Sequence, residues 1–417
     1  MVLNEFKNKR ILILGFGKEG KDAFLFFRKM FPDKVLGIAD RKQIKVKAKR
    51  IKKHFGKNYF KSLKRYDIVI KSPGIPFKIL PKSEIKKVVT QTDIFFDNCK
   101  GKIVGVTGTK GKSTTASLIF QILKKAGLKV HLTGNIGKPI LNLLPLTTNK
   151  DIYVYELSSH QLYNLKKSPQ VAVFLNIYPE HLDYYRNFKE YALAKANIAR
   201  YQKKEDFLIF NSQDKIIKAI AKKSKAKKIP IKGKYYELNK AAAKATTKVF
   251  KIKEKIIEKA IKEFKPLPHR LELVGTYKGI TFYNDALATI PEATIAAMDT
   301  LGKRVETIML GGFDRKINFK KLAEKVLKNK VRTVILFPTT GEKIWKEIVR
   351  QAKKERPNHF FANNMERAVK VAYQYTGENN ICLLSTASSS FSIFKDYEEK
   401  GNLFKKYVRK YGTGKKT

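Results

Sequence analysis

Residues 105–115 read GVTGTKGKSTT and carry the strongest chemical signal in the chain. An apolar stretch enters this segment and an amphipathic stretch leaves it, which predicts a strand, a glycine-rich loop and a helix in succession. The glycines at 108 and 111 let backbone amides close around phosphate oxygens, and the N-terminus of the helix adds a favourable dipole. The segment therefore predicts a site for ATP or a very similar nucleotide.

The side chains that follow the loop suit the same ligand. Lys112 offers a positive charge to the β- and γ-phosphates, and the hydroxyl of Ser113 or Thr114 can hold Mg²⁺. Strict Walker spacing places a glycine at position 106, where this chain has Val106. The alternative is a chance turn in a lysine-rich protein, but the flanking strand and helix favour a variant phosphate loop.

Two further side chains that can bind metal follow predicted strands. Glu156 lies at the end of the apolar stretch 151–157, and His181 follows the stretch 171–177. The carboxyl ends of parallel strands line the ligand crevice of an open α/β sheet, so both side chains are candidates for a site there. From these residues alone, a solvated loop acid and a histidine outside any metal site remain the alternatives.

The elements that have to position these residues alternate regularly along the chain. Strand-like apolar stretches alternate with amphipathic helical ones, which predicts an α/β protein with largely parallel sheets. Residues 203–268 are lysine-rich and less patterned, and the prolines of PLPHR at their end indicate a linker. We predict three domains: a Rossmann-like domain at 1–98, a central P-loop ATPase-like domain at 99–267 and a Rossmann-like C-terminal domain at 268–417.

The charge of the chain is extreme, with 88 Lys and Arg against 36 Asp and Glu and a formal net charge of +52. Such a field attracts polyanions, so a nucleic-acid partner has to be weighed. The lysines are spread along the whole chain among many Ile, Phe, Tyr and Asn, a mix that an A+T-biased genome produces. We find no zinc finger, RNP-like aromatic pair or basic region joined to heptads, and we predict that nucleic acid is not the partner.

Other bulk features concern the compartment. No apolar stretch approaches the roughly 18 residues of a membrane helix, and the first one, at 11–14, is too short for a signal peptide. Two cysteines, Cys99 and Cys382, cannot build a disulfide framework or a four-ligand metal site. These features predict a cytoplasmic protein without a membrane partner.

A series of motifs in order along the chain resembles the Mur ligase family over essentially its full length. The central motifs are GNIG, YELSSHQL, NIYPEHLDYY and YALAKANI, and the later ones are PHRLELV, FYNDALAT, MLGGFDRK and LLSTASSSFSIFKDYEEKGNLF. GFGKEG at 15–20 and SPGI at 72–75 resemble the D-glutamate-adding branch, where ELSSHQL has the related form ELSSFQL. The D-N-P-R motif of the branch that adds diaminopimelate or lysine is absent, and the folylpolyglutamate branch normally lacks such an N-terminal domain.

The resemblance implies ATP-dependent addition of D-glutamate to UDP-N-acetylmuramoyl-L-alanine through an acyl phosphate, with ATP and two Mg²⁺ ions as cofactors. Such a protein has to position three reactants and neutralise the charge at the phosphoryl group. The residues implied for ATP are Gly108, Thr109, Lys110, Gly111, Lys112, Ser113, Thr114, Asn239, Arg270 and Asp285. The implied catalytic residues are Lys112, Glu156, His181 and Lys195; the implied metal ligands are Ser113, Glu156, His181 and, if carbamylated, Lys195.

The resemblance also implies two substrate pockets. The residues implied for the UDP-sugar are Gly17, Lys18, Glu19, Gly20, Asp40, Ser72, Gly74, Asn135, Ser158 and Ser159. For the two serines of this set that follow Glu156, a helix N-cap is an equally good interpretation. The residues implied for D-glutamate are Thr289, Arg315, Ser390 and Tyr397, because hydroxyls and a guanidinium suit a dicarboxylate.

Departures from the family pattern gather in the amino-acid pocket. Ala286 stands where serine is usual, Leu287 and Arg315 where lysine is usual, and Thr386 where proline is usual. A sibling ligase with a different amino acid or acceptor is therefore one alternative, and a basic nucleic-acid-associated ATPase is another. The resemblance and the self-repulsion of the charge suggest a monomer.

Overall fold

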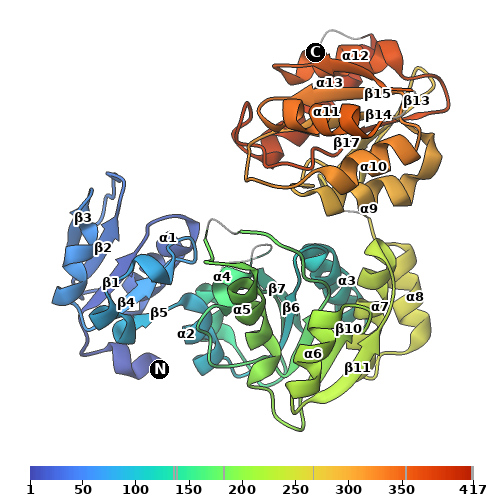
Figure 1. The fold of residues 1–417 in the computed structure, drawn as a ribbon. Coiled ribbons are helices and arrows are strands. Elements are labelled where there is room, and N and C mark those ends of the chain that lie inside the picture. The colour runs from blue at the N-terminus through green and yellow to red at the C-terminus, as the bar shows by residue number, and fades with distance from the viewer. Residues whose placement is uncertain (135–136, 138–139, 182–183, 266, 353–354, 415–417) are drawn as a thin grey trace. The chain divides into compact units, whose positions relative to one another are not determined.

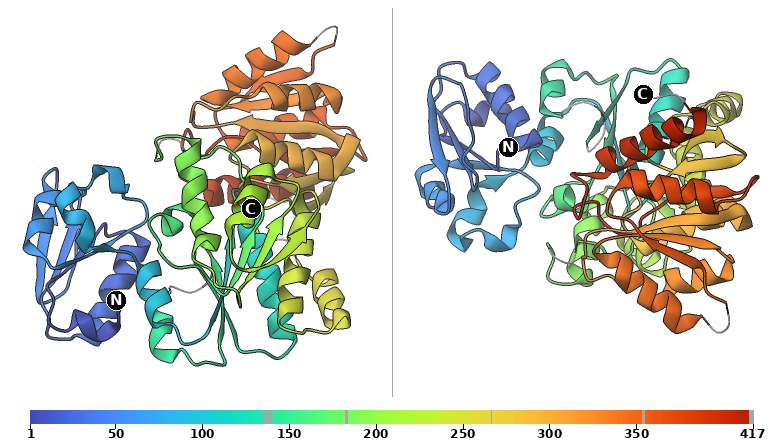
Figure 2. Two further views of the ribbon diagram at one scale, coloured as in Figure 1. Left: turned by 60° about the horizontal axis from the view of Figure 1, so that its bottom comes forward. Right: turned by 90° about the horizontal axis from the view of Figure 1, so that it is seen from above.

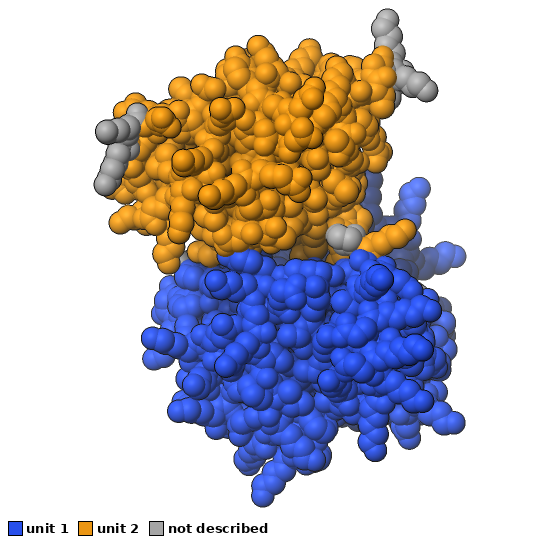
Figure 3. Space-filling view, turned by 90° about the vertical axis from the view of Figure 1, so that its right-hand side faces the viewer, with its two compact units in different colours: residues 1–264 blue, residues 265–417 orange. Residues whose placement is uncertain are grey.

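The computed structural model describes residues 1–134, 137, 140–181, 184–265, 267–352 and 355–414. The chain forms two compact units, Met1–Phe264 and Lys265–Thr417 (Figure 3). Unit 1 contains two parallel sheets and unit 2 contains one mixed sheet (Figure 1). The predicted α/β class with largely parallel sheets is thereby confirmed.

The first sheet of unit 1 has the strand order β3-β2-β1-β4-β5, and its strand pairs are all parallel. Its strands are β1 (Ile11–Leu14), β2 (Leu36–Asp40), β3 (Ile51–Phe55), β4 (Ile68–Lys71) and β5 (Val88–Val89). Two helices accompany it, α1 (Lys18–Met30) and α2 (Gln91–Asn98). The loops after β1 and β4 both leave the carboxyl edge of this sheet, so GFGKEG and SPGI meet there.

The second sheet of unit 1 has the order β11-β10-β9-β6-β8-β7, again with parallel pairs. Its strands are β6 (Lys102–Thr107), β7 (Val130–Gly134), β8 (Ile152–Glu156), β9 (Val171–Phe174), β10 (Phe207–Asn211) and β11 (Lys227–Ile231). Its helices are α3 (Lys112–Lys125), α4 (Ser159–Leu162), α5 (Phe188–Arg200), α6 (Lys215–Lys223), α7 (Tyr235–Val249) and α8 (Glu254–Lys262).

Helices cover both faces of this second sheet, as the two views of Figure 2 show. Ile103 of β6 packs into one apolar cluster with residues of α5, and its neighbour Val104 packs into another with residues of α3, α7 and α8. Successive side chains of a strand point to opposite faces, so a strand buried on both faces is apolar throughout. This explains why the segment before the phosphate loop is a continuous apolar run.

Unit 2 is built on a sheet of order β12-β13-β17-β14-β15-β16, in which only the β12–β13 pair is antiparallel. Its strands are β12 (Glu272–Tyr277), β13 (Ile280–Asn284), β14 (Val305–Gly311), β15 (Thr333–Phe337), β16 (Asn358–Phe361) and β17 (Ile381–Leu384). Its helices are α9 (Pro291–Leu301), α10 (Lys320–Lys328), α11 (Thr340–Gln351), α12 (Met365–Tyr375) and α13 (Tyr397–Thr413).

The three sheets match the three predicted α/β blocks, while the domain boundaries at 98/99 and 267/268 stay predictions. The stretch 203–268 is lysine-rich and less patterned in sequence, yet its described residues form two strands and three helices. Lysine is a good helix former, and its long side chain tolerates the exposed faces of these helices. No helix in the described part of the chain is long and apolar enough to cross a membrane.

Candidate active site

The phosphate loop is shaped by the backbone at its second glycine. Gly111 has φ +83°, in the left-handed region that favours glycine, and α3 begins at the next residue. A methyl group at Gly111 would lie 2.4 Å from Oδ1 of Asn239, a residue of α7. Asn239 also accepts a hydrogen bond from the Thr115 hydroxyl at 3.2 Å. The structure thus brings one predicted adenine-site residue against the predicted phosphate loop.

The lysine of the loop folds back onto the loop itself. Lys112 Nζ donates to the carbonyl oxygens of Gly108 at 3.1 Å and Thr109 at 2.9 Å. Ser113 is buried, and Thr114 is half-buried. The ammonium therefore lies over the loop, where phosphate oxygens of a bound nucleotide would offer it stronger, charge-assisted partners than carbonyls.

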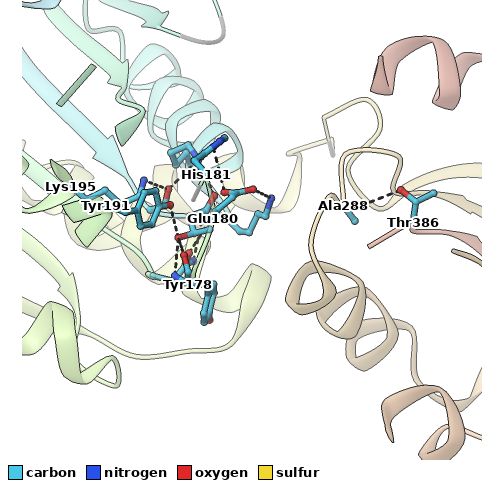
Figure 4. A network of polar contacts seen from close by, with 12 residues as sticks. Tyr178, Glu180, His181, Tyr191, Lys195, Ala288 and Thr386 are labelled. Atoms are coloured by element: carbon cyan, nitrogen blue, oxygen red, sulfur yellow. Dashed lines mark hydrogen bonds and ion pairs between the residues drawn. The ribbon is translucent and has the colours of Figure 1, made fainter. Parts of the chain in front are cut away.

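Residues after β9 and one residue of α5 hold the phosphate loop in this shape. Asn176 accepts from the Lys110 N–H at 2.8 Å and donates to the Lys110 carbonyl at 3.0 Å. The Tyr178 N–H donates to the Thr109 hydroxyl at 2.9 Å, and the Tyr191 hydroxyl lies 3.0 Å from the same oxygen. The loop is therefore preorganised by protein contacts (Figure 4).

A charged pair flanks the loop. Lys110 Nζ lies 3.0 Å from the carboxylate of Glu180. Burial tends to raise the pKa of Glu180, but the charges of Lys110, His181 and Lys112 outweigh it and bring the pKa to about 2. Glu180 is therefore ionised at neutral pH and offsets part of the positive charge collected around the loop.

Two buried side chains face the same edge of the sheet. Glu156, the last residue of β8, is 3% exposed, and its Oε2 has no hydrogen-bond partner among the described residues. Lys195 of α5 is also buried; its Nζ donates to the Gly108 carbonyl at 2.8 Å and lies over the Tyr191 ring. Burial first, and the charge of Lys112 second, lower the pKa of Lys195 well below its ordinary range.

The Glu156 oxygen that has no partner among the described residues tests whether the residues at this edge of the sheet fit a metal cation. An ionised carboxylate oxygen buried without a partner is costly, and a divalent cation is the partner that hard oxygen ligands take. The residues present therefore fit a Mg²⁺ ion near Glu156. The described residues contain no group of three or more His, Cys, Asp or Glu that could hold a metal, so protein side chains of these types do not complete such a site by themselves.

His181 follows β9 in a left-handed backbone conformation, with φ +58°. Its ring packs edge to face against the ring of His160, with 4.8 Å between centroids, and lies 6.4 Å from the Tyr191 ring (Figure 4). Burial, followed by the charge of His181, lowers the pKa of His160 to about 3. The structure therefore places His181 near the phosphate loop, and it adds a second, neutral imidazole that sequence reasoning did not single out.

The predicted UDP-sugar residues of the first sheet lie together at its carboxyl edge. Gly15 has φ +87°, and a methyl group at Gly20 would lie 1.9 Å from the Gly15 carbonyl oxygen, so this turn requires glycine at both positions. Ser72 donates from its hydroxyl to the Gly15 carbonyl at 2.7 Å, which ties the SPGI loop to the GFGKEG loop. Asp40 accepts from the Phe16 N–H at 2.7 Å.

The remaining residues of the first sheet that were predicted to bind the UDP-sugar have different surroundings. Gly17 caps α1, Lys18 begins it, and Gly74 is exposed. Glu19 turns its carboxylate inward, where it accepts from Gln161 Nε2 at 3.2 Å. Burial raises the pKa of Glu19 to about 7, although the hydrogen bond from Gln161 and the charge of Lys71 act against this rise.

Of the two serines after Glu156, one is a helix N-cap. Ser158 caps α4: its hydroxyl accepts from the Gln161 N–H at 3.2 Å, and the Gln161 side chain accepts in return from the Ser158 N–H. Ser159 is the buried first residue of that helix. Asn135, predicted to contact the UDP-sugar, lies outside the described residues.

In unit 2, the predicted nucleotide residues lie at the end of β13. Asp285 accepts from the Leu271 N–H at 3.1 Å and from the Ser385 hydroxyl at 2.8 Å, so its carboxylate is anchored between the segment before β12 and the loop after β17. Arg270 is half-buried and begins the segment that leads into β12. Its neighbour His269 is buried, and its ring Nδ1 lies 3.0 Å from Nδ2 of Asn284.

The predicted amino-acid residues of unit 2 come from separate loops at the same sheet edge. Thr289 and Arg315 are half-buried and follow β13 and β14, and Tyr397 begins α13. The Ser390 hydroxyl is buried without a hydrogen-bond partner among the described residues. An unpaired hydroxyl at this edge suits a ligand atom that is supplied from outside the chain.

One buried lysine of unit 2 was missed by sequence reasoning. Lys400 Nζ donates to the Thr386 hydroxyl at 2.6 Å. Thr386 donates on to the Ala288 carbonyl at 3.3 Å (Figure 4). Burial lowers the pKa of Lys400 to about 7, against the opposing charge of Asp285. The hydroxyl of Thr386 thus links the loop after β17 to the loop after β13. A proline at this position would have no hydroxyl to do so.

Comparison with known protein families accounts for most of the chain. Residues 106–289 match the family model described as the Mur ligase middle domain, and residues 269–388 match the one described as the Mur ligase, glutamate ligase domain. The UDP-N-acetylmuramoylalanine–D-glutamate ligase of Acetivibrio thermocellus is 34% identical, over 97% of this chain and 98% of that protein. The enzyme of the same name from Clostridium kluyveri is 31% identical, over 96% and 97%.

Solved structures agree in fold at lower identity. The MurF ligase of Thermotoga maritima in complex with ADP has a TM-score of 0.61 and 17% identity, covering 98% of each chain. The UDP-N-acetylmuramate–alanine ligase MurC of the same organism has a TM-score of 0.61 and 16% identity, covering 98% of this chain and 100% of its own. With relatives above 30% identity aligned over nearly its whole length, the chain belongs to the Mur ligase family.

Proposed function

We propose that this protein is an ATP-dependent ligase that adds D-glutamate to UDP-N-acetylmuramoyl-L-alanine in peptidoglycan synthesis. The observation that carries the reaction class is local to unit 1: a preorganised phosphate loop lies beside a buried, unpaired carboxylate oxygen and a buried lysine. The substrates follow from the relatives named UDP-N-acetylmuramoylalanine–D-glutamate ligase, which align over nearly the whole chain.

Each residue of the loop has a task in this proposal. Backbone amides at the N-terminus of α3 bind phosphate oxygens, while the Lys110 N–H stays with Asn176. Lys112 moves from the loop carbonyls to the β- and γ-phosphates. Asn239 reads the adenine from its place against Gly111. The acceptor carboxylate takes the γ-phosphoryl group, and the resulting acyl phosphate has a leaving group that the amine of the amino acid can displace.

The metal ligands are proposed from Ser113, Glu156, His181 and Lys195, with two Mg²⁺ ions that neutralise charge at the phosphoryl group. Lys195 is proposed to hold metal as its carbamate. Carbamate formation needs an unprotonated amine, and burial of Lys195 together with the charge of Lys112 favours that form. The carbamate is proposed from the family resemblance alone. In the structure the Lys195 Nζ donates to the Gly108 carbonyl.

The substrate pockets are proposed at the carboxyl edges of two sheets. The loops 15–20 and 72–75 in unit 1 are proposed to bind the UDP group, and Thr289, Arg315, Ser390 and Tyr397 in unit 2 to bind D-glutamate. Arg270 and Asp285 are proposed to contact ATP. Consumption of ATP and a UDP-sugar is in line with the cytoplasm as the predicted compartment.

A phosphate-release assay with ATP and Mg²⁺ tests the reaction class. A ligase releases phosphate only when both UDP-N-acetylmuramoyl-L-alanine and an amino acid are present, and Lys112→Ala serves as the inactive control. Phosphate release that is stimulated by DNA or RNA, falls steeply with salt and ignores the UDP-sugar would instead identify a nucleic-acid-associated ATPase.

A further inference from the structure

Tyr184 contacts two parts of unit 1: the histidines near the phosphate loop and the loop 72–75 of the first sheet. No role was predicted for it from the sequence. It lies three residues after His181, and its N–H donates to the His181 carbonyl at 3.0 Å. Its ring packs edge to face on His160, with 4.2 Å between centroids. Its hydroxyl lies 3.0 Å from the carbonyl oxygen of Pro73 and 3.2 Å from that of Ile75, and it donates to this pair.

The loop that receives this hydroxyl is held from a second direction. Lys71, the buried last residue of β4, donates from its Nζ to the carbonyls of Ser72 at 3.0 Å and Ile75 at 2.8 Å. Two donors therefore converge on the carbonyl oxygens of a four-residue loop. Such contacts fix the direction of the peptide planes in the loop, because each peptide unit is rigid and planar.

The orientation of one peptide plane matters for binding. In a trans peptide the N–H points opposite to the C=O of the same unit, so the Tyr184 hydroxyl on the Pro73 carbonyl aims the Gly74 N–H away from Tyr184. Among the described residues, the Gly74 N–H has no hydrogen-bond partner, and a methyl group built on Gly74 meets nothing within 4 Å. The N–H is thus a donor without a partner among these residues, and the space beside the Gly74 Cα is open.

We propose that Tyr184 is a positioning residue for the UDP subsite: its hydroxyl holds the Pro73 carbonyl so that the Gly74 N–H is directed at an acceptor oxygen of the nucleoside diphosphate. This inference rests on the proposed function. It assigns the segment after His181 a second task, because the same residue that packs on His160 orients the loop of the neighbouring sheet.

Titration of UDP into the protein tests the proposal. Tyr184→Phe keeps the ring against His160 and removes the hydroxyl, so UDP affinity should fall about fivefold, the value expected for one lost hydrogen bond. Affinity for a non-hydrolysable ATP analogue should stay within about twofold of the wild type. Tyr185→Phe is the matched control, because among the described residues the Tyr185 hydroxyl makes no hydrogen bond to the loop 72–75. Unchanged UDP affinity in Tyr184→Phe overturns the proposal.

A double-mutant cycle separates positioning from general destabilisation. Gly74→Pro removes the N–H, whereas Gly74→Ala keeps it. If Tyr184 acts through this N–H, adding Tyr184→Phe to Gly74→Pro should weaken UDP binding by less than about twofold further, while adding it to Gly74→Ala should still cost about fivefold. Equal further losses in both backgrounds overturn the proposal.

A second measurement covers the case in which Gly74→Pro does not fold. In protein labelled with ¹⁵N-glycine, the Gly74 resonance is the one that disappears in Gly74→Ala. It should move on addition of UDP in the wild type and move less than half as far in Tyr184→Phe; no movement in the wild type overturns the proposal. Absence of any UDP binding by the wild type would instead count against the proposed function.

Discussion

Replacement of Glu19 by glutamine should stabilise unit 1 at alkaline pH and leave it unchanged in acid. Burial raises the pKa of the Glu19 carboxyl from 4.5 to about 7. The folded protein therefore binds this proton more tightly than the unfolded chain between about pH 4.5 and pH 7. The contribution of the group to stability is accordingly present in full below about pH 4.5, and it is lost as pH rises through about 7.

The size of the effect follows from the same numbers. The difference between 4.5 and about 7 corresponds to about 3 kcal/mol, at ~1.4 kcal/mol per pKa unit. Glutamine keeps the shape and an oxygen that can accept from Gln161, and it resembles the protonated carboxyl that the wild type carries in acid. The hydrogen bond from Gln161 to the ionised form is already included in the pKa of about 7. Glu19→Gln should therefore be about 3 kcal/mol more stable than the wild type at pH 8, or about 8 °C in unfolding temperature for a unit of this size.

Scanning calorimetry of both proteins between pH 4.5 and pH 8 measures the difference directly. The exposed Glu205 lies in the same unit, so Glu205→Gln provides the matched control for removal of a surface carboxylate. Equal unfolding temperatures of Glu19→Gln and the wild type at pH 8 would show that ionised Glu19 does not destabilise the fold. A difference that stays constant over the whole pH range would show the same.

Three further predictions concern the phosphate loop and unit 2. Gly111→Ala places a methyl group 2.4 Å from Asn239 Oδ1 at φ +83°, so titration should show at least about tenfold weaker binding of an ATP analogue. Lys112→Ala should lower phosphate release more than about 100-fold in the ligase assay, while its unfolding temperature stays within about 2 °C of the wild type. Burial lowers the pKa of Lys400 from 10.5 to about 7, so the wild type should gain stability as pH rises from about 7 toward 10.5; Lys400→Met should lack this gain in calorimetry.

The phosphate loop was predictable because its signal is local. A buried strand, two glycines, a lysine and hydroxyls follow one another within 105–115, and the structure forms each element where the pattern indicates it. The alternation of strands and helices predicted the α/β class for the same reason. Ser158 was predictable only as two alternatives, since N-caps and ligand contacts use the same residue types, and the structure shows the cap.

The contacts that cross between elements were not predictable from one sequence. Lys71 and Lys400 are two of 88 basic residues, and only tertiary packing makes them buried cations. The inward turn of Glu19 depends on Gln161, which is 142 residues away along the chain. Tyr184 belongs to a motif that the family resemblance covers, but its link to Pro73 arises from the packing of two sheets.

Mass spectrometry of the reaction product tests the proposed ligase reaction and its amino-acid substrate together. The protein is incubated with ATP, Mg²⁺ and UDP-N-acetylmuramoyl-L-alanine against a panel of amino acids that includes both glutamate enantiomers. We expect a product one glutamyl residue heavier with D-glutamate and none with L-glutamate, despite Leu287 and Arg315 in the proposed amino-acid pocket. A product formed with another amino acid and not with D-glutamate would contradict the proposed substrate, and no product with any of them would contradict the ligase assignment itself.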